Sequence, residues 1–257
     1  KGGIPAVYGG RLSSVLDIQM KEGNNQNFQG EGGIGLISSR LTLEGPIVKG
    51  KSSFLVSGRR TYGFDLAQPF IRQTDFAGTN YFFYDLNAKM NYQFSQKDRI
   101  YLSGYFGRDV LTFAQPGRDF QFTLPYGNAT ATLRWNHLFT EKLFFNLSAI
   151  YNDYQFKAGF EQEEFNFDIF SGVRDFTAKF DFDYFPSNDH QVKTGIHATK
   201  HRLTPNIIRG SAGETEFENT ATAKYANEYA IYLQDDWKIN PWFRVNLGLR
   251  GTLFQQI

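Results

Sequence analysis

Alternation between apolar and polar residues, sustained over long segments, constrains the fold of this chain more than any other feature of its 257 residues. From Phe82 to Phe94 every second residue is apolar, and from Asp85 to Gln93 the positions between them carry Asp, Asn, Lys and Gln. Residues 174–184 repeat the pattern. A period of two indicates a strand with one apolar and one polar face, because a helix would scatter these residues around its circumference. The sequence therefore predicts an all-β chain.

The expected strands are long for a globular protein. Their alternation persists over about 12–17 residues, whereas ordinary strands run about 5–6. A tilted strand that crosses a membrane needs about 9–11 residues in the hydrocarbon, which favours a transmembrane antiparallel β-barrel. About eleven strands are expected on this basis, near residues 27–35, 38–47, 52–62, 81–95, 99–111, 126–140, 143–158, 168–185, 190–203, 224–239 and 243–257.

Short and long connections alternate along the chain. The short turns are expected at 48–51, 95–98, 140–142, 186–189 and 240–242. The long loops are expected near 62–80, 112–125, 159–167 and 204–222. Bacterial barrels have short periplasmic turns and long extracellular loops, so the predicted location is the cell outer membrane in that orientation. An odd number of strands would leave an unpaired edge, so further strands are expected to close the barrel.

Composition excludes several classes of protein. Aromatic residues make up 17% of a chain whose mean hydropathy is -0.43, which fits a wall with rings on one side and polar groups on the other. The net charge of +1 does not favour nucleic acid as a partner. No cysteine is present, and the four histidines form no metal-ligand motif, so neither metal nor cofactor is expected. No nucleophile–base set occurs, and Asp235 and Asp236 would face opposite sides of a strand. The chain is not expected to be an enzyme.

Three glycines near the N-terminus match a dinucleotide-binding fingerprint by spacing. Gly30, Gly32 and Gly35 fit G-x-G-x-x-G, which requires a helix start after the last glycine. The alternating residues that follow predict a strand instead, so no helix N-terminus is available for a phosphate. Glycine within a strand marks a bend or a close backbone approach. Gly30 and Gly32 are therefore expected at the entry into the barrel wall, in contact with a plug.

Two stretches resemble TonB-dependent outer-membrane receptors. Residues 2–23, GGIPAVYGGRLSSVLDIQMKEG, resemble the end of the plug domain, and residues 229–250, YAIYLQDDWKINPWFRVNLGLR, resemble a barrel hairpin of that family. Residues 38–62 are similar to the first hairpins of members from Bacteroidota. The resemblance implies a tail of the plug domain at 1–25 and the first half of the barrel at 26–257.

The resemblance implies a plugged barrel of about 22 strands that binds and imports a siderophore, vitamin, glycan or peptide. TonB would bind a segment upstream of the chain. Outer-membrane lipid and lipopolysaccharide would surround the barrel, and a surface lipoprotein or another outer-membrane subunit is a further possible partner. Lys1 stands where many members have an Arg that holds the plug. This replacement keeps the positive charge but loses the bidentate hydrogen bonding of a guanidinium group. The alternative function is a structural or assembly subunit of a larger outer-membrane complex.

Two sets of candidate contact residues follow. The residues expected to join plug and barrel are Lys1, Arg11, Gly30 and Gly32. The loop residues expected to bind substrate are Tyr81, Arg118 and Asp119. Alternatively, Tyr81, Phe82 and Phe120 belong to an outer aromatic girdle. The inward polar residues, expected to meet lumen water or the plug, are Arg59, Asn87, Lys89, Arg134, Asp181 and Arg250.

Overall fold

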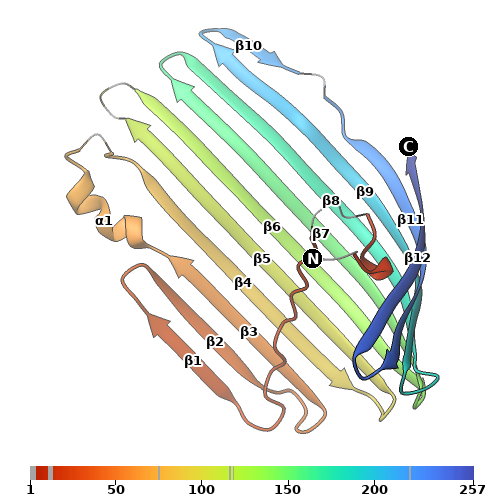
Figure 1. Ribbon diagram of the computed structural model, residues 1–257. Coiled ribbons are helices and arrows are strands. Elements are labelled where there is room, and N and C mark those ends of the chain that lie inside the picture. The colour runs from red at the N-terminus through yellow and green to blue at the C-terminus, as the bar shows by residue number, and fades with distance from the viewer. Residues whose placement is uncertain (1–3, 11–13, 75, 116, 118, 220) are drawn as a thin grey trace.

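The chain forms a single curved, antiparallel sheet of twelve strands in the part that the structure describes (Figure 1). The computed structural model describes residues 4–10, 14–74, 76–115, 117, 119–219 and 221–257. The strands are β1 (Gln29–Ile34), β2 (Ser38–Pro46), β3 (Ser52–Thr61), β4 (Asn80–Gln93), β5 (Asp98–Gln115), β6 (Phe120–Thr140), β7 (Leu143–Gln162), β8 (Phe165–Tyr184), β9 (His190–Ala212), β10 (Thr215–Glu218), β11 (Lys224–Asn240) and β12 (Phe243–Gln256). Successive strands pair in chain order, except that β10 pairs only with β9, and β11 also pairs with β9. The sheet is therefore open, with β1 and β12 at its edges.

The all-β prediction is confirmed, and each expected strand has a counterpart in the sheet. The strand expected after the glycine-rich stretch is β2, which begins at Ser38. The short turns join the strands at the lower end of Figure 1. The path from β1 to β12 without β10 has the expected number of strands, and β10 is a short extension beyond β9.

Three of the four long loops were predicted wrongly. Residues 112–125, 159–167 and 204–222 lie largely in strands, because β5–β6, β7–β8 and β9–β10 continue their pairing far beyond the expected ends. Cross-strand phenylalanine pairs extend these hairpins, as between Phe113 and Phe122 and between Phe160 and Phe167. Aromatic pairs of this kind stabilise antiparallel strands, so ladder pairing continues where a loop was expected.

The fourth long connection contains a helix that the alternation did not predict. α1 (Gly63–Ile71) lies between β3 and β4 at the upper end of the sheet (Figure 1). Asp65 in its first turn suits the helix dipole, and the Gln68 side chain donates a hydrogen bond to the Thr79 carbonyl at 2.8 Å. The helix has only 9 residues and contains Pro69, a residue that is unfavourable inside a helix, so the sequence was interpreted as a loop here. None of the described helices is long and apolar enough to cross a membrane.

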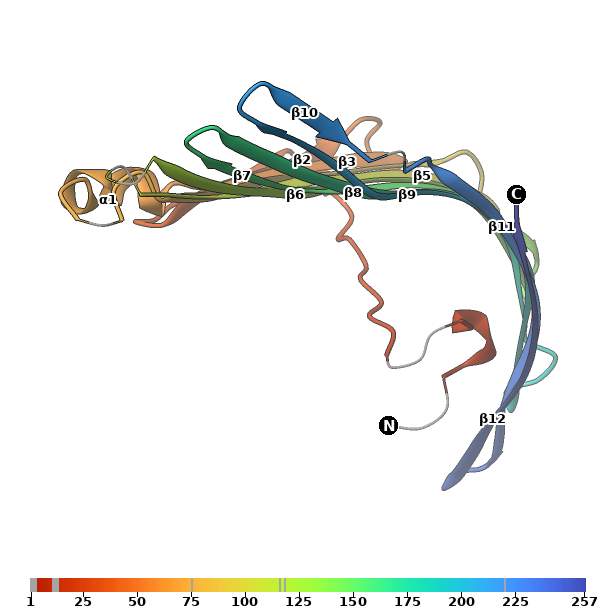
Figure 2. The same ribbon diagram turned by 90° about the horizontal axis from the view of Figure 1, so that it is seen from above.

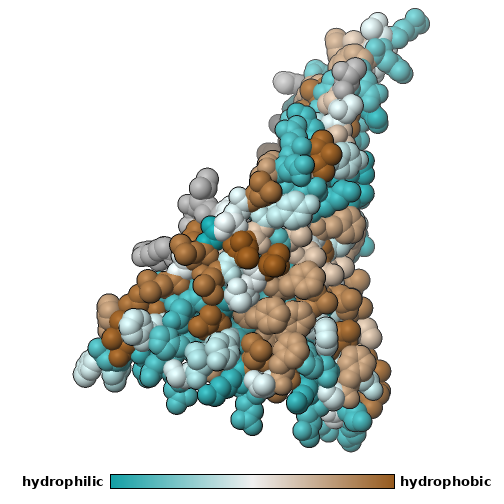
Figure 3. All heavy atoms as spheres, turned by 90° about the vertical axis from the view of Figure 1, so that its right-hand side faces the viewer, coloured by the Kyte–Doolittle hydropathy of each residue, from teal (hydrophilic) through white to brown (hydrophobic). Residues whose placement is uncertain are grey.

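The convex face of the sheet carries exposed apolar side chains. Arg250 contacts the chain segment that lies on the concave side, so its neighbour Leu249, 79% exposed, faces outward. Register extends this assignment across the sheet, and Figure 3 shows apolar side chains gathered in one zone with hydrophilic ones beyond it. The exposed apolar residues of the convex face include Leu41, Leu43, Val56, Leu86, Met90, Leu102, Phe106, Leu133, Phe176, Phe180, Ile196, Ile231, Leu233, Leu247 and Leu253.

Charged and aromatic side chains bound this apolar zone. On β8 the convex positions from Phe176 to Tyr184 are aromatic or Ala, and Arg174 ends the series in an ion pair with Asp153 at 2.7 Å. Toward the short turns, the Trp135 and Phe145 rings meet at 5.9 Å. The length of the series matches the roughly 9–11 residues that a tilted strand needs to cross hydrocarbon. The convex face thus has the pattern of a lipid-facing barrel wall.

Candidate functional site

The N-terminal segment (residues 4–10 and 14–28) crosses the hollow of the sheet and forms the candidate site with the residues beneath it. In Figure 2 the segment leaves β1, passes through the concave side and ends near β11 and β12. A 3-10 helix, η1 (Ala6–Tyr8), lies near its start, and no strand is assigned to its described residues. Its backbone groups are therefore free to bind side chains of the sheet.

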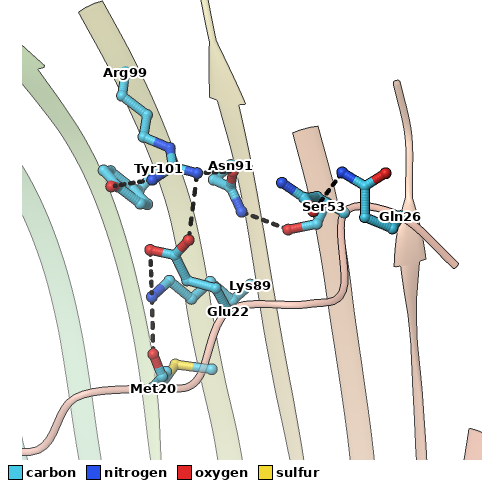
Figure 4. A network of polar contacts seen from close by, with 9 residues as sticks. Met20, Glu22, Gln26, Ser53, Lys89, Asn91, Arg99 and Tyr101 are labelled. Carbon is cyan, nitrogen blue, oxygen red and sulfur yellow. Dashed lines mark hydrogen bonds and ion pairs between the residues drawn. The ribbon is translucent and has the colours of Figure 1, made fainter. Parts of the chain in front are cut away.

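A charged cluster of the sheet holds the end of this segment that lies closer to β1 (Figure 4). The Glu22 carboxylate lies 3.9 Å from Lys89 Nζ and 3.5 Å from Arg99 Nη2. Lys89 also donates a hydrogen bond to the Met20 carbonyl at 2.8 Å. Lys89 belongs to β4 and Arg99 to β5, so neighbouring strands position the two cations on one face.

Beneath the charged cluster lies a buried polar pair. Arg99 donates to Asn91 Oδ1 at 3.2 Å, and Asn91 donates to Ser53 Oγ at 2.6 Å. Asn91 and Ser53 are 3% and 1% exposed, so the cluster continues into the wall without open solvent. Buried polar groups that have such partners hold their positions well.

Close backbone contact adds to these interactions. A Cβ at Gly23 would collide with the Phe54 carbonyl oxygen, so only glycine allows this approach. The amide of Gly50 donates to the Asn25 carbonyl at 2.9 Å. Lys21 Nζ lies 3.1 Å from the Glu44 carboxylate of β2. The segment is thus fixed to β2, β3, β4 and β5 together.

A second attachment point lies at η1. The Arg250 guanidinium donates to the carbonyls of Ala6 and Val7 at 3.2 and 3.5 Å. A Cβ at Gly248 would lie 2.7 Å from Ala6 Cβ, and one at Gly9 would collide with the Arg250 side chain. Two small residues therefore let η1 lie against β12. The segment is fixed at both ends by noncovalent contacts, which can break and reform without chemistry.

The concave wall also holds carboxylate–histidine pairs. His197 Nε2 lies 2.8 Å from Asp181 Oδ1, which also accepts a 2.7 Å hydrogen bond from the Tyr232 hydroxyl. His201 Nδ1 lies 2.8 Å from Asp175 Oδ1. Among the described residues, no group of three or more His, Cys, Asp or Glu could hold a metal ion. Each pair links neighbouring strands and has no nucleophile at its centre.

The glycines predicted to contact a plug lie in β1, next to β2. A Cβ at Gly30 would lie 3.2 Å from Leu43 Cδ2, and one at Gly32 would lie 3.7 Å from Leu41 Cδ1. Both leucines belong to the convex face, opposite the N-terminal segment. Plug contact by these glycines stays a prediction. The other two residues of that set, Lys1 and Arg11, lie outside the described residues.

The residues predicted to bind substrate lie toward the upper end of the sheet. The Tyr81 hydroxyl donates to Asp109 Oδ1 at 3.0 Å, on the concave face. Asp119 has a positive φ of 46° just before β6, and its carbonyl accepts a 3.4 Å hydrogen bond from the Glu163 amide. Arg118 is outside the described part of the chain. Substrate binding by this set stays a prediction.

The structure brings together residues that alternation identified only in part. Lys89 and Arg250 were expected on the inward face, and both contact the N-terminal segment. Glu22 and Arg99 were not identified as site residues. Arg99 lies four residues from Ser103, the register partner of Lys89, and therefore on the same face, so strand alternation indicates its inward position. Glu22 lies in an irregular segment and had no such signal.

Comparison with known proteins connects the fold to receptors. No protein-family model and no curated protein matches the sequence. The ferric preacinetobactin receptor BauA of Acinetobacter baumannii matches with a TM-score of 0.64 at 10% identity, covering 92% of this chain and 42% of that one. A variant of the ferric enterobactin receptor PfeA of Pseudomonas aeruginosa gives 0.58 at 13%, covering 90% and 40%. The ferric yersiniabactin uptake receptor FyuA of Yersinia pestis gives 0.55 at 10%, covering 89% and 40%.

These likenesses show the fold. The twelve-stranded open sheet matches part of the barrel of TonB-dependent receptors, and this chain spans about two fifths of the length of the receptors compared.

Proposed function

We propose that the chain forms part of the barrel wall of a TonB-dependent outer-membrane receptor that binds and imports a nutrient. One observation carries the proposal: the N-terminal segment lies across the polar concave face and is fixed there at both ends, by Arg250 and by the cluster around Glu22. A segment in this position occupies lumen space. It acts as the tail of a plug, and its reversible contacts suit a part that must shift for passage.

The proposed surroundings of the barrel follow from its two faces. The apolar convex face suits outer-membrane lipid and lipopolysaccharide, with the short turns in the periplasm. TonB binds a segment upstream of the chain and pulls on the plug. A surface lipoprotein or another outer-membrane subunit is a further proposed partner, at the end of the sheet that carries α1 and β10.

A reversible cross-link tests whether the segment must move. The variant Ala6→Cys with Gly248→Cys places two thiols where the side-chain positions adjoin, and the chain has no other cysteine. A slight shift reaches the Cβ separation of roughly 3.5–4.5 Å that a disulfide needs. The matched control, Ser103→Cys with Thr132→Cys, joins register partners within the wall.

The assay follows radiolabelled nutrients that accumulate in cells with the full-length protein. We expect one nutrient whose uptake requires TonB, stops when Ala6→Cys/Gly248→Cys is oxidised and returns with dithiothreitol. The control pair should not stop it. Uptake that never requires TonB would refute the importer and favour the alternative, a structural subunit of an outer-membrane complex. Uptake unchanged by the first cross-link would refute movement of the segment at η1.

A further inference from the structure

In the lower part of the sheet the apolar side chains lie on the convex face, whereas in the upper part they lie on the concave face. Ser103 is the register partner of Lys89, which contacts the N-terminal segment, and Phe113 lies an even number of residues further along β5, on the same concave face. Pairing continues from Phe113 through five neighbouring strands. The phenylalanine row consists of Phe113, Phe122, Phe160, Phe167 and Phe217.

The phenylalanine row belongs to a continuous apolar surface. Phe120 packs edge-on against Phe113 at 5.9 Å and Phe160 at 5.3 Å. One register level below, Ile169 pairs with Ala158 and Ile208. The concave positions at these levels carry no charged residue in the described part of β5–β10.

Charges at this height lie on the opposite face. Lys157 pairs with Asp168 at 2.8 Å, and Arg209 pairs with Glu218 at 3.0 Å. The row also lies above Arg174 and Asp153, which end the apolar zone of the convex face, so lipid does not account for it. An apolar surface that faces the mouth of a barrel and lies outside the lipid zone marks a binding site.

Hydrogen-bond acceptors lie directly below this surface. Asp109 accepts a hydrogen bond from Tyr81 at 3.0 Å and interacts with its register partner Tyr126. The nearby carboxylate of Asp85 forms an ion pair with Arg59 at 2.8 Å. Asp109, in contrast, forms no ion pair with a basic residue in the described part of the chain.

A second acceptor, on β6, lies on the same concave face, one concave position closer to the short turns. Oδ1 of Asn128 is buried and has no hydrogen-bond partner, and Asn128 pairs in register with Gly107, beside Asp109. Buried acceptors are rarely left without a donor. A carboxylate and an amide oxygen together match an ammonium or guanidinium group, which donates several hydrogen bonds and carries a positive charge.

We propose that this surface binds an amphipathic ligand whose apolar body lies against the phenylalanine row and whose cationic end lies against Asp109 and Asn128. The proposal rests on the proposed function, since it names the substrate class of the same receptor. The uncharged row selects for the apolar body, and the unbalanced carboxylate selects against an anionic end.

Two fluorescent probes of equal size test the proposal on the full-length protein in lipid nanodiscs. The probes are dansyl-labelled Leu-Phe-Lys amide and dansyl-labelled Leu-Phe-Glu amide, titrated by fluorescence anisotropy. The wild type should bind the cationic probe at least about tenfold more tightly, as expected for a hydrogen-bonded charge pair. Asp109→Asn should remove this preference, and Phe160→Ser should weaken both probes about tenfold. Asp168→Asn, on the opposite face, is the matched control and should change neither affinity.

The ratio of the two affinities is measured on one sample, so misfolding of a variant is not mistaken for loss of selectivity. Absence of binding to the wild type, equal affinity for the two probes, or an unchanged preference in Asp109→Asn would overturn the proposal. The TonB dependence of uptake separates it from the proposed function. Selective binding without TonB-dependent uptake would retain the ligand site and refute the importer, whereas TonB-dependent uptake without selectivity would do the reverse.

Discussion

Replacing Gly23 by alanine should loosen the N-terminal segment without touching a charge. The new Cβ would overlap the carbonyl oxygen of Phe54, which belongs to β3 and is held between Gly45 of β2 and Met90 of β4. The sheet cannot yield at such a position without losing ladder pairing, so the segment must move away by about 1 Å or more.

The shift breaks contacts on both sides of Gly23. The hydrogen bond from the Gly50 amide to Asn25, 2.9 Å long, contributes about 0.5–1.5 kcal/mol, and the one from Lys89 to Met20, 2.8 Å long, about 1.5–3 kcal/mol. Their loss lowers the free energy of opening the segment by about 2–4.5 kcal/mol. The opening constant then rises roughly 30- to 2,000-fold.

Hydrogen exchange measures this opening directly. In the full-length protein in nanodiscs, peptides that cover Gly50, whose amide donates to the Asn25 carbonyl, should exchange faster in Gly23→Ala by that factor. The control is Gly251→Ala, whose Cβ would lie 3.8 Å from Ile231 Cγ2, an ordinary contact. Exchange in Gly23→Ala within about twofold of the wild type would show that the close approach does not fix the segment.

Three further outcomes are expected. Arg250→Gln should weaken the attachment of η1 by about 1–3 kcal/mol, because two carbonyls lose a charged donor, and faster proteolysis near residues 6–10 would report it. Leu133→Arg should cost about 2–4 kcal/mol of folding free energy in a bilayer, whereas Thr132→Arg on the concave face should cost less; urea titrations in lipid vesicles compare them. Tyr232→Phe should lower the free energy of unfolding by about 1 kcal/mol in the same titration, because Asp181 loses the hydrogen bond from Tyr232 but retains its contact with His197.

How far the fold was predictable differs between the two ends of the strands. Near the short turns, apolar residues alternate outward, as in the series from Phe176 to Tyr184, and the strands were predicted close to their observed ends. Near the long connections the apolar positions move to the concave face, as at Phe113 and Phe160. Where the apolar residues change face, the outward alternation stops. This was interpreted as the end of each strand, so three loops were expected where the hairpins continue.

The candidate site was predictable on one side only. Lys89 and Arg250 follow from strand register, because alternation fixes which face a residue occupies. Their partners lie in a segment without regular structure, where no period exists to indicate direction. Glu22 and the carbonyl of Met20 could therefore not be assigned to them from the sequence.

The sequence by itself determined the secondary structure class and the face that most strand residues occupy, because a period of two is a local property of neighbouring residues. Only the tertiary structure decided which residues meet across the hollow of the sheet. The contact of Glu22 with Lys89 and Arg99, and that of Arg250 with Ala6, depend on the path of the N-terminal segment and on the curvature of the sheet. Path and curvature arise from pairing along the whole sheet, which no short stretch of residues contains.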